Sequence, residues 1–473
     1  MVDLIVVIGY FCVMLIVGWR SRLQSAECYW IAERRYGTGK ITASLVATIF
    51  GASSTMGVIG LGYARGLTGA WWSLIGGIVL IPFGLFLASR VRALNVYTLP
   101  DILKNAYGEK VAVPAGLMIA LSWLGVIAAQ LIAGGRLLQA VFPIDFQLAL
   151  AVVAVVFTLY TFWGGQLSVI RTDIWQFLLF VAGLFIALAF LMASPASVPS
   201  QWGQVPADHF RFPVSSGFGW YEVLVFYPLI VGLPYLVGPD IYSRVFCAQD
   251  NRVARGAALR AACIVIPLSL LLAFFGLLAR SKFPGIAPEA AFPKTLDILV
   301  PVGIKGLIVA GFLGAVMSSA DTCLLSASTI LTLNVIGPTC RVSKESHLKI
   351  TRWAVLIIGA IAWLVAGQQR GIISSLLLGY TIFVGGVVLP TLATFFRKQI
   401  KITPWGALWA IIVGGGSAIL GKVHGGVALK TMLTPSGQSF LETVLGRQYP
   451  SLLPIVLSFI VMLGVSRLTR SSE

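Results

Sequence analysis

Stretches of about twenty apolar residues recur along the whole chain. A helix needs roughly 20 such residues to cross the hydrocarbon core of a bilayer. Hydrophobic residues make up 58% of the 473 residues and charged residues only 11%, a balance that excludes a soluble protein of this size. We therefore predict an all-α polytopic membrane protein in the lipid bilayer, with about thirteen spans at 4–18, 42–60, 70–89, 112–140, 146–162, 174–194, 220–238, 261–279, 306–330, 353–368, 372–395, 404–421 and 450–466.

The chain is expected to lie in the cell (inner) membrane with its N-terminus outside and its C-terminus in the cytoplasm. Most of its 34 Lys and Arg residues fall into the loops that this orientation places inside. The run Leu4–Val17 lacks the basic start and the small-residue cleavage site of a signal peptide, so we expect it to be a retained first helix.

Several functional classes find no support in the sequence. The net charge of +17 comes from loop residues and not from a basic helix, which argues against nucleic acid. Three histidines, six cysteines without a CxxC pair and the lack of a GxxxxGK[ST] loop argue against an enzyme, a thiolate metal site and direct use of ATP. We therefore expect a protein that is not an enzyme, is driven by an ion gradient and shows no sign of an obligatory protein partner.

Two predicted spans contain residues that break helices. The second span carries GASSTMG at 51–57, and the seventh carries three prolines and two glycines between Pro228 and Pro239. Non-helical backbone at this depth must line a polar cavity or be satisfied by protein groups. The five-span blocks 42–194 and 220–395 run in opposite senses, which is typical of an inverted repeat, with 4–18 and 404–466 as added helices. A kinked bundle without a transport role is the alternative.

Four polar residues interrupt the apolar ninth span: Ser318, Ser319, Asp321 and Thr322. An aspartate inside a membrane costs ~2.5–3.5 kcal/mol on insertion scales, so it marks a functional site by default. Serine and threonine alone could simply join helices. Asp173 begins the sixth span, where it is either an ion ligand or a carboxylate favoured by the helix dipole.

The chain resembles the sodium:solute symporter family, which includes proline, sugar, sialic acid and pantothenate transporters. The resemblance covers nearly the whole chain and rests on four segments in family order: ATIFGASSTMGVIGLGYARG at 47–66, YTLPDILKNAYG at 97–108, YTFWGGQLSVIRTDIWQ at 160–176 and GFLGAVMSSADTCLLSASTILTLNV at 311–335. It implies a LeuT-type 5+5 inverted repeat and sodium-coupled symport of a small organic solute by alternating access.

The resemblance also implies ion ligands. A sodium site is expected at the carbonyls of Ala47, Phe50 and Ala315 and the hydroxyls of Ser318 and Ser319. Oxygen ligands of this kind suit a hard cation. A possible second cation site consists of Asp173, Ser318, Asp321 and Thr322. Asp321 replaces a hydroxyl residue of the two-sodium relatives, so a second sodium, a proton and no second ion all remain open.

The same comparison favours an amino acid or a carboxylate over a sugar as the solute. The segment GPDIYSR at 238–244 keeps only Arg244 of the pattern in sugar-transporting relatives. Short hydroxyl residues stand where those relatives have long polar side chains, and Ile49 replaces an aspartate of the proline transporters. The expected solute contacts are Ser53, Ser54, Trp123 and Tyr235.

Two alternative functions stay open at this point. The chain could be a proton-coupled transporter of the same fold, or a membrane sensor module that does not transport. Arg136, at the outer end of the fourth span, could attract a carboxylate, or it could extend its charge to the interface as a snorkelling arginine.

Overall fold

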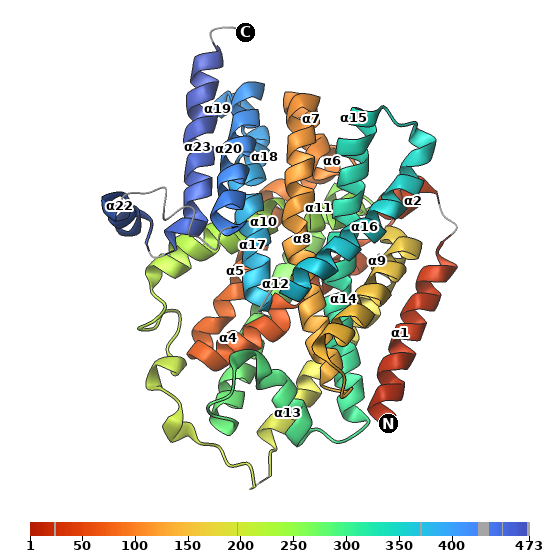
Figure 1. Cartoon of the computed structure of the whole chain (residues 1–473), viewed down its shortest axis with the longest axis vertical. Coiled ribbons are helices and arrows are strands. Elements are labelled where there is room, and N and C mark those ends of the chain that lie inside the picture. Colours follow the sequence, from red (N-terminus) through yellow and green to blue (C-terminus); the bar gives the residue numbers. More distant parts are fainter. Residues whose placement is uncertain (23–24, 196, 369–370, 424–434, 447, 471–473) are drawn as a thin grey trace.

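The computed structural model shows a bundle of helices (Figure 1). It describes residues 1–473 except 23–24, 196, 369–370, 424–434, 447 and 471–473. Within the described residues the only extended pairing is two isolated bridges, Tyr36 with Ala248 and Ser215 with Phe218. The prediction of an all-α fold is confirmed.

The helices, with π-helical and 3₁₀ segments written η, have the following bounds: α1 (Val2–Arg20), α2 (Ala26–Ile31), η1 (Ala32–Arg34), α3 (Thr38–Ile49), η2 (Ser53–Gly57), α4 (Val58–Arg65), η3 (Gly66–Ala70), α5 (Trp71–Pro82), η4 (Phe83–Leu87), α6 (Ala88–Ala93), α7 (Leu99–Tyr107), α8 (Glu109–Gln139), α9 (Phe146–Met192), η5 (Trp202–Gln204), η6 (Ala207–Phe210), η7 (Glu222–Phe226), η8 (Pro228–Gly232), α10 (Leu233–Val237), α11 (Pro239–Phe246), α12 (Asn251–Lys282), η9 (Pro288–Ala290), α13 (Ala291–Leu299), α14 (Ile304–Ile330), η10 (Leu331–Ile336), α15 (Gly337–Cys340), η11 (Lys344–Ser346), α16 (His347–Gln368), α17 (Ile372–Phe383), η12 (Val384–Val388), α18 (Leu389–Phe395), α19 (Arg397–Ile400), α20 (Pro404–Val423), α22 (Pro435–Leu445) and α23 (Tyr449–Thr469).

Eleven helical segments of the described chain are long and apolar enough to cross a membrane. The two longest are Ser53–Ala93 with 41 residues and Phe146–Met192 with 47. A straight helix of 47 residues would extend about 70 Å against a core of about 30 Å. The second segment, α9, bends at Gly165, where φ is 56°. The two chain ends lie at opposite ends of the bundle (Figure 1). The number thirteen stays a prediction.

Both predicted helix breaks are present. Helix α3 ends at Ile49, Phe50 has ψ 47°, and helical structure resumes as the π-helical segment η2. In the seventh span, α10 ends at Val237, Gly238 is extended with ψ 136°, and α11 follows. Gly51 is required by close packing, because a Cβ there would lie 2.5 Å from the Ser319 hydroxyl.

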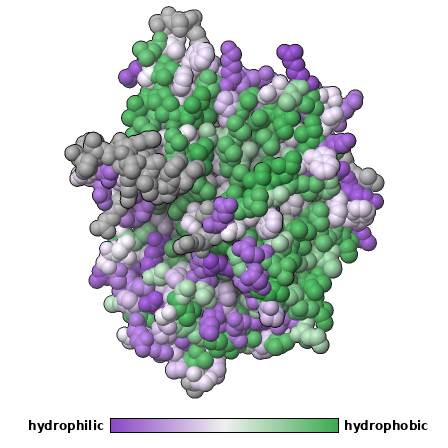
Figure 2. All heavy atoms as spheres, viewed as in Figure 1, coloured by the Kyte–Doolittle hydropathy of each residue, from purple (hydrophilic) through white to green (hydrophobic). Residues whose placement is uncertain are grey.

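The ninth predicted span, α14, is the centre of the bundle. Of its most apolar window, 94% is buried inside the protein, against 33% for α1 and α23. Helices α1, α3, α8, α9, α11 and α16 all contact α14. Apolar side chains cover much of the outer surface over the upper and middle parts of the bundle, and polar ones gather at its lower end (Figure 2). Polar residues of α14 are therefore kept from lipid.

Helices α4 and α12 pack in close backbone contact, because glycine residues lie at their interface. A Cβ on Gly276 would lie 2.0 Å from the backbone oxygen of Ile59, and one on Gly62 would lie 2.3 Å from that of Ala273. Small residues bring membrane helices close enough for direct backbone contact. This contact fixes α4, the second half of the first broken helix.

We expect Gly276→Ala to lower the apparent Tm in detergent, because the added methyl group must push α4 away. Overpacking of this kind costs about 1–3 kcal/mol. Gly464→Ala in α23 is the matched control, since a Cβ there meets nothing within 4 Å. Equal Tm values for the two variants, measured by thermal unfolding, would contradict the close contact.

Candidate ion and solute site

The break in the first core helix leaves backbone carbonyls available to a ligand. The Phe50 amide donates to Val46 (3.0 Å), and the Thr55 amide and hydroxyl donate to the Gly51 carbonyl (3.0 and 2.7 Å). Among the described residues no backbone amide outside the helices donates to the carbonyls of Ala47 or Phe50. These carbonyls keep their lone pairs free, as a cation site at a helix break requires.

The hydroxyl residues of α14 lie against this break. The Ser319 hydroxyl lies close to Gly51, and the Gln130 side chain of α8 accepts a hydrogen bond from the Ala52 amide (2.7 Å). Ser318 is fully buried on the same helix, and Ala315 is 1% exposed one turn earlier. The structure therefore brings the five predicted sodium ligands onto two contacting elements, the end of α3 and the middle of α14.

Asp173 of α9 is fully buried and has three partners. Its Oδ1 accepts from the Ser318 hydroxyl (2.6 Å), and its Oδ2 accepts from the Ser44 hydroxyl of α3. The guanidinium of Arg244 lies 3.3 Å from Oδ2, and both side chains of this ion pair are 0% exposed. The carboxylate is thus a tertiary contact, and not merely a favourable charge at a helix start.

Arg244 of α11 contacts two residues that were predicted as ligands of a second cation. Its Nε donates to the Thr48 hydroxyl (3.1 Å), and its Nη2 donates to the Thr322 hydroxyl as well as facing Asp173. The guanidinium therefore contacts two of the four predicted ligands, Asp173 and Thr322. Whether a further cation binds there stays a prediction.

Asp321 is fully buried but lies in a different setting. Its Oδ1 accepts a hydrogen bond from the Thr161 hydroxyl of α9 (2.9 Å). Its Oδ2 has no hydrogen-bond partner among the residues that the structure describes. The structure separates Asp321 from the Asp173 cluster by hydrogen bonding, although both carboxylates interact electrostatically.

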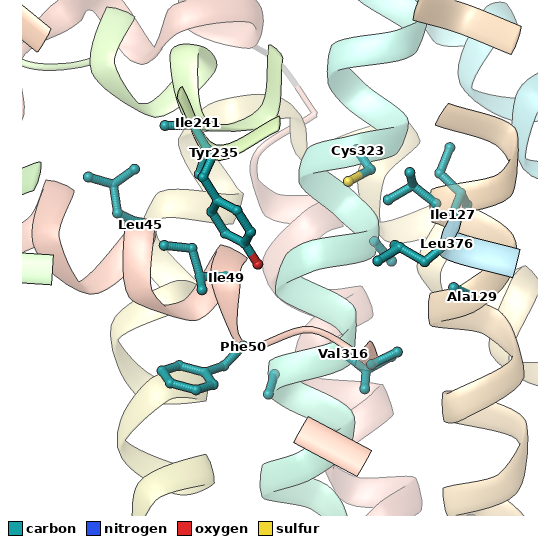
Figure 3. Close-up of a cluster of buried hydrophobic side chains, with 14 of the residues drawn as sticks. Leu45, Ile49, Phe50, Ile127, Ala129, Tyr235, Ile241, Val316, Cys323 and Leu376 are labelled. Carbon is teal, nitrogen blue, oxygen red and sulfur yellow. The ribbon is translucent and has the colours of Figure 1, made fainter. Parts of the chain in front are cut away.

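The predicted solute contacts are also buried inside the bundle. The hydroxyls of Ser54 and Tyr235 are 3.4 Å apart, which joins the two broken helices. The Tyr235 ring points from its helix towards the break, with Phe50 and Val316 below and Cys323 across from it on α14 (Figure 3). Trp123 lies beside the Cys323 thiol and packs edge-on against Phe383 with 4.8 Å between the ring centroids. The fourth predicted contact, Ser53, is 6% exposed in η2.

Arg136 forms an ion pair with Glu289, so neither snorkelling nor a solute carboxylate is needed to explain its charge. Glu289 belongs to η9, and its other oxygen accepts from the Ile372 amide at the start of α17 (3.4 Å). The backbone of Pro288 also packs on Gly60 in α4. Through these contacts η9 links α8, α17 and α4 at the lower end of the bundle in Figure 1.

Some site residues were not predicted from the sequence. Gln130 and Ser44 are polar residues inside apolar spans, the same signal that drew attention to Asp321. Cys323 gave no signal, because a buried thiol packs like a small apolar side chain. No group of three or more His, Cys, Asp or Glu side chains that could hold a metal ion occurs in the described part of the chain.

Two broken helices that cross beside a buried ion cluster define a secondary transporter with an inverted-repeat core. The model of the sodium:solute symporter family matches residues 29–414. The chain belongs to the sodium:solute symporter family, which confirms the resemblance. Membership indicates sodium as the coupling ion and a transport protein that is not an enzyme.

Relatives of this chain have different solutes in their names. It is 25% identical over 464 residues to sodium/glucose cotransporter 4 of Danio rerio, covering 87% of this chain and 70% of that protein. It is 26% identical over 449 residues to the osmoregulated proline transporter OpuE of Bacillus subtilis (strain 168), covering 89% and 88%. The family is therefore shared among proteins named for sugars and for an amino acid.

Solved structures share the fold. A substrate-bound, outward-open Na⁺-coupled sialic acid symporter superposes with a TM-score of 0.76 at 18% identity, covering 99% of this chain and 98% of that one. The transporter MhsT in complex with L-phenylalanine gives a TM-score of 0.56 at 15% identity, covering 90% and 99%. The predicted LeuT-type fold is confirmed.

We expect Arg244→Ala to destabilise the protein strongly, because it leaves the Asp173 carboxylate buried without its cation. Breaking a buried ion pair from one side costs about 3–5 kcal/mol. The double variant Asp173→Ala/Arg244→Ala should lose less than the sum of its single variants. Lys104→Ala, which breaks an exposed pair with Glu109, is the control and should cost at most about 1 kcal/mol. Additive losses in thermal unfolding would show that the buried pair is not coupled.

Proposed function

We propose that this protein is a sodium-coupled symporter of a small amino acid or carboxylate that works by alternating access. The observation that carries the proposal is the non-helical link at Phe50–Ala52, which lies against Ser319 of the most buried helix in the bundle. We infer an orientation with the N-terminus outside and the C-terminus in the cytoplasm from the placement of Lys and Arg.

Sodium binds between the carbonyls of Ala47, Phe50 and Ala315 and the hydroxyls of Ser318 and Ser319. Five neutral oxygens provide a hard cation with ligands but no fixed charge. The site uses elements from both inverted repeats, since α3 belongs to the first and α14 to the second. A cation held there stabilises only the arrangement in which these elements meet.

Arg244 supplies the positive charge of the buried group around Asp173. Its guanidinium contacts Asp173 and Thr322 and donates to Thr48, so the carboxylate already has a counter-charge. A second sodium at Asp173 would lie against this guanidinium and be repelled by it. We therefore propose one sodium per transport cycle.

Solute binds between η2, Tyr235 and Trp123. The helical segment that starts at Ser53 directs its amide groups and the positive end of its dipole towards this region, which favours a carboxylate. Buried apolar side chains lie in the same region as Tyr235, including Ile127, Val316 and Leu376 (Figure 3). The hydroxyls of Ser53 and Ser54 belong to short side chains, and a sugar hydroxyl left unpaired in a buried site is costly. This lining supports a small amino acid or a short carboxylate.

Sodium and solute are coupled because both contact the same break. Sodium fixes Phe50 and its neighbours, and the solute contacts begin three residues later at Ser53. A coupling of ~1–3 kcal/mol is typical of such linked sites and changes solute affinity roughly 5- to 150-fold. In the proton-coupled alternative, the solute affinity depends in the same way on pH and not on the sodium concentration.

We expect Ser319→Ala to weaken sodium binding at least severalfold, because it removes one oxygen ligand. Ser318→Ala should do the same and should also disturb Asp173, to which Ser318 donates. Ser328→Ala is the matched control on the same helix, since that hydroxyl bonds only to the Leu324 carbonyl in its own helix (2.7 Å). Thermal stability titrated with sodium against choline chloride measures the affinity. Unchanged sodium stabilisation in both site variants would refute the site.

The solute class is tested with the same measurement on the unaltered protein. In saturating sodium, one member of a panel of amino acids and short carboxylates should raise the Tm further, with a gain of about 2.7 kcal/mol at a hundredfold excess over Kd. Sugars and inositol should have no effect. The gain should vanish when choline replaces sodium. Stabilisation by a sugar alone would overturn the proposed solute class.

A further inference from the structure

A groove on the outer surface of the bundle lies between α9 and α16. Its volume is about 240 Å³, and its lining consists of α9 residues between Ala151 and Leu159 and α16 residues between Leu356 and Trp363. Val155 and Trp363, on its two sides, are 57% and 38% exposed. An apolar cavity of roughly 150 Å³ already takes up a benzene-sized molecule. On this face of a membrane protein the groove is filled by lipid or by another apolar surface.

The lining of the groove suits a hydrocarbon chain. Apart from the Thr158 hydroxyl and the Trp363 indole, its side chains are aliphatic or absent. A Cβ on Gly359 would lie 2.5 Å from the Thr158 hydroxyl oxygen, so the two helices are in direct contact there. The missing side chain of Gly359 and the small side chain of Ala360 leave the space between the larger residues open.

The groove leads along α16 to Arg352. This arginine precedes Leu356 by four residues, a spacing that places both on one face of the helix. It precedes Trp363 by eleven residues, which is about 16 Å of helix. Half of a hydrocarbon core of about 30 Å is nearly the same length. A lipid whose headgroup lies at Arg352 can therefore place one acyl chain along the groove through about one leaflet.

Arg352 lies at the end of the groove, where α16 meets α9 and the end of α1. Its guanidinium lies over the ring of Tyr29 at 5.4 Å from the centroid, and its Nη2 donates to the Arg22 carbonyl. The Tyr29 hydroxyl in turn donates to the Thr161 carbonyl of α9 (3.0 Å), two residues beyond the last lining residue, Leu159. The apolar groove is thus closed at this end by a cation.

The two arginines at this end have no acidic partner. Within the described part of the chain no carboxylate lies within 4.0 Å of Arg22 or Arg352, and the Arg352 Nε has no hydrogen-bond partner there. Arg22 lies 3.9 Å from the centroid of the Trp19 ring, which packs edge-on against Trp163 of α9. Tryptophan is enriched where protein meets lipid headgroups, and guanidinium groups bind phosphate through paired hydrogen bonds.

We propose that this groove and the two arginines bind one anionic phospholipid. One acyl chain lies between α9 and α16, and the phosphate lies between Arg22 and Arg352. A lipid is the occupant because apolar groove and unpaired cations adjoin, whereas a free anion would use only the arginines. A second copy of the chain would have to present an acidic group beside a projecting apolar side chain. The lipid site uses no residue of the proposed sodium or solute sites.

The full-length protein, purified in detergent and depleted of lipid, provides the test. Its Tm is measured while dioleoyl phosphatidylglycerol, dioleoyl phosphatidylcholine or inorganic phosphate is added. The anionic lipid should raise the Tm and bind at least about fivefold more tightly than the zwitterionic lipid, because each arginine near an anionic headgroup contributes about that factor. Inorganic phosphate at the same concentration should have no effect. Native mass spectrometry should show one phosphatidylglycerol retained per chain.

Two pairs of variants separate the headgroup from the acyl chain. Arg352→Gln should weaken phosphatidylglycerol binding about fivefold, and Arg255→Gln, exposed on α12, should leave it unchanged. Ala360→Phe fills the groove and should lower the affinity for both phospholipids at least severalfold. Ile357→Phe is its control, since Ile357 is 56% exposed on the same helix but lies outside the groove lining.

Several results would overturn the lipid site. Equal affinity for the two phospholipids does so, as does an Arg352→Gln or Ala360→Phe variant that binds lipid like the unaltered protein. Stabilisation by inorganic phosphate alone would identify a free-anion site instead. If Ala360→Phe turns a dimer into a monomer in light scattering and leaves lipid binding intact, a second copy occupies the groove. If Arg352→Gln does not fold, Arg22→Gln replaces it, because the Arg22 backbone carbonyl that accepts from Arg352 is retained.

Discussion

The structure depends on the buried carboxylate of Asp173. It attaches α9 to α3 through Ser44, to α14 through Ser318 and to α11 through Arg244. An unpaired charge at this depth costs several kcal/mol, so these helices cannot separate without replacing each lost partner. The partners come from both broken helices of the inverted repeat, since Ser44 precedes one break and Arg244 follows the other. Ser318 then links the carboxylate to the proposed sodium site.

The helix breaks explain why this network can respond to a ligand. An intact α3 would use its carbonyls internally, but the link at Phe50–Ala52 leaves two of them free and holds the Ala52 amide on Gln130. The second break at Gly238 allows Tyr235 to point towards the first break and Arg244 to reach the ion cluster. The proposed sodium and solute sites and the Arg244 guanidinium therefore share the same few turns of backbone. In the proposed mechanism, each of the three affects the others by changing how those turns pack.

Local features of the helices could be predicted from the sequence, but contacts between helices could not. Hydropathy indicated an apolar helical bundle, and helix breakers located both breaks, because each depends on a local property. Polar residues inside an apolar run drew attention to Ser318 and Asp321 for the same reason, whereas Asp173, at the start of a predicted span, could equally have been a helix-start carboxylate. Arg244 could not be placed, since its partner Asp173 lies on another helix and nothing local to either residue indicates the pairing. The separate spans predicted at 146–162 and 174–194 agree with Gly165, whose φ of 56° and ψ of −166° interrupt the helical geometry of α9 between them.

The cost of separating contacts differs between the centre and the lower end of the bundle, and this difference favours motion at the lower end. At the lower end in Figure 1, Arg136 and Glu289 are 29% and 27% exposed, so water can replace the pair at little cost. At the upper end, Asn334 bridges η10 to Asp101 of α7 with a hydrogen bond of 2.7 Å and also accepts from Thr98 (2.7 Å). The partly exposed pair of Arg136 and Glu289 is therefore cheaper to exchange than the contacts of Asp173, whereas Asn334 and Thr98 are buried like Asp173, at 3% and 4% exposed. Under the proposed alternating access, the lower end of the bundle thus opens at less cost than the centre around Asp173.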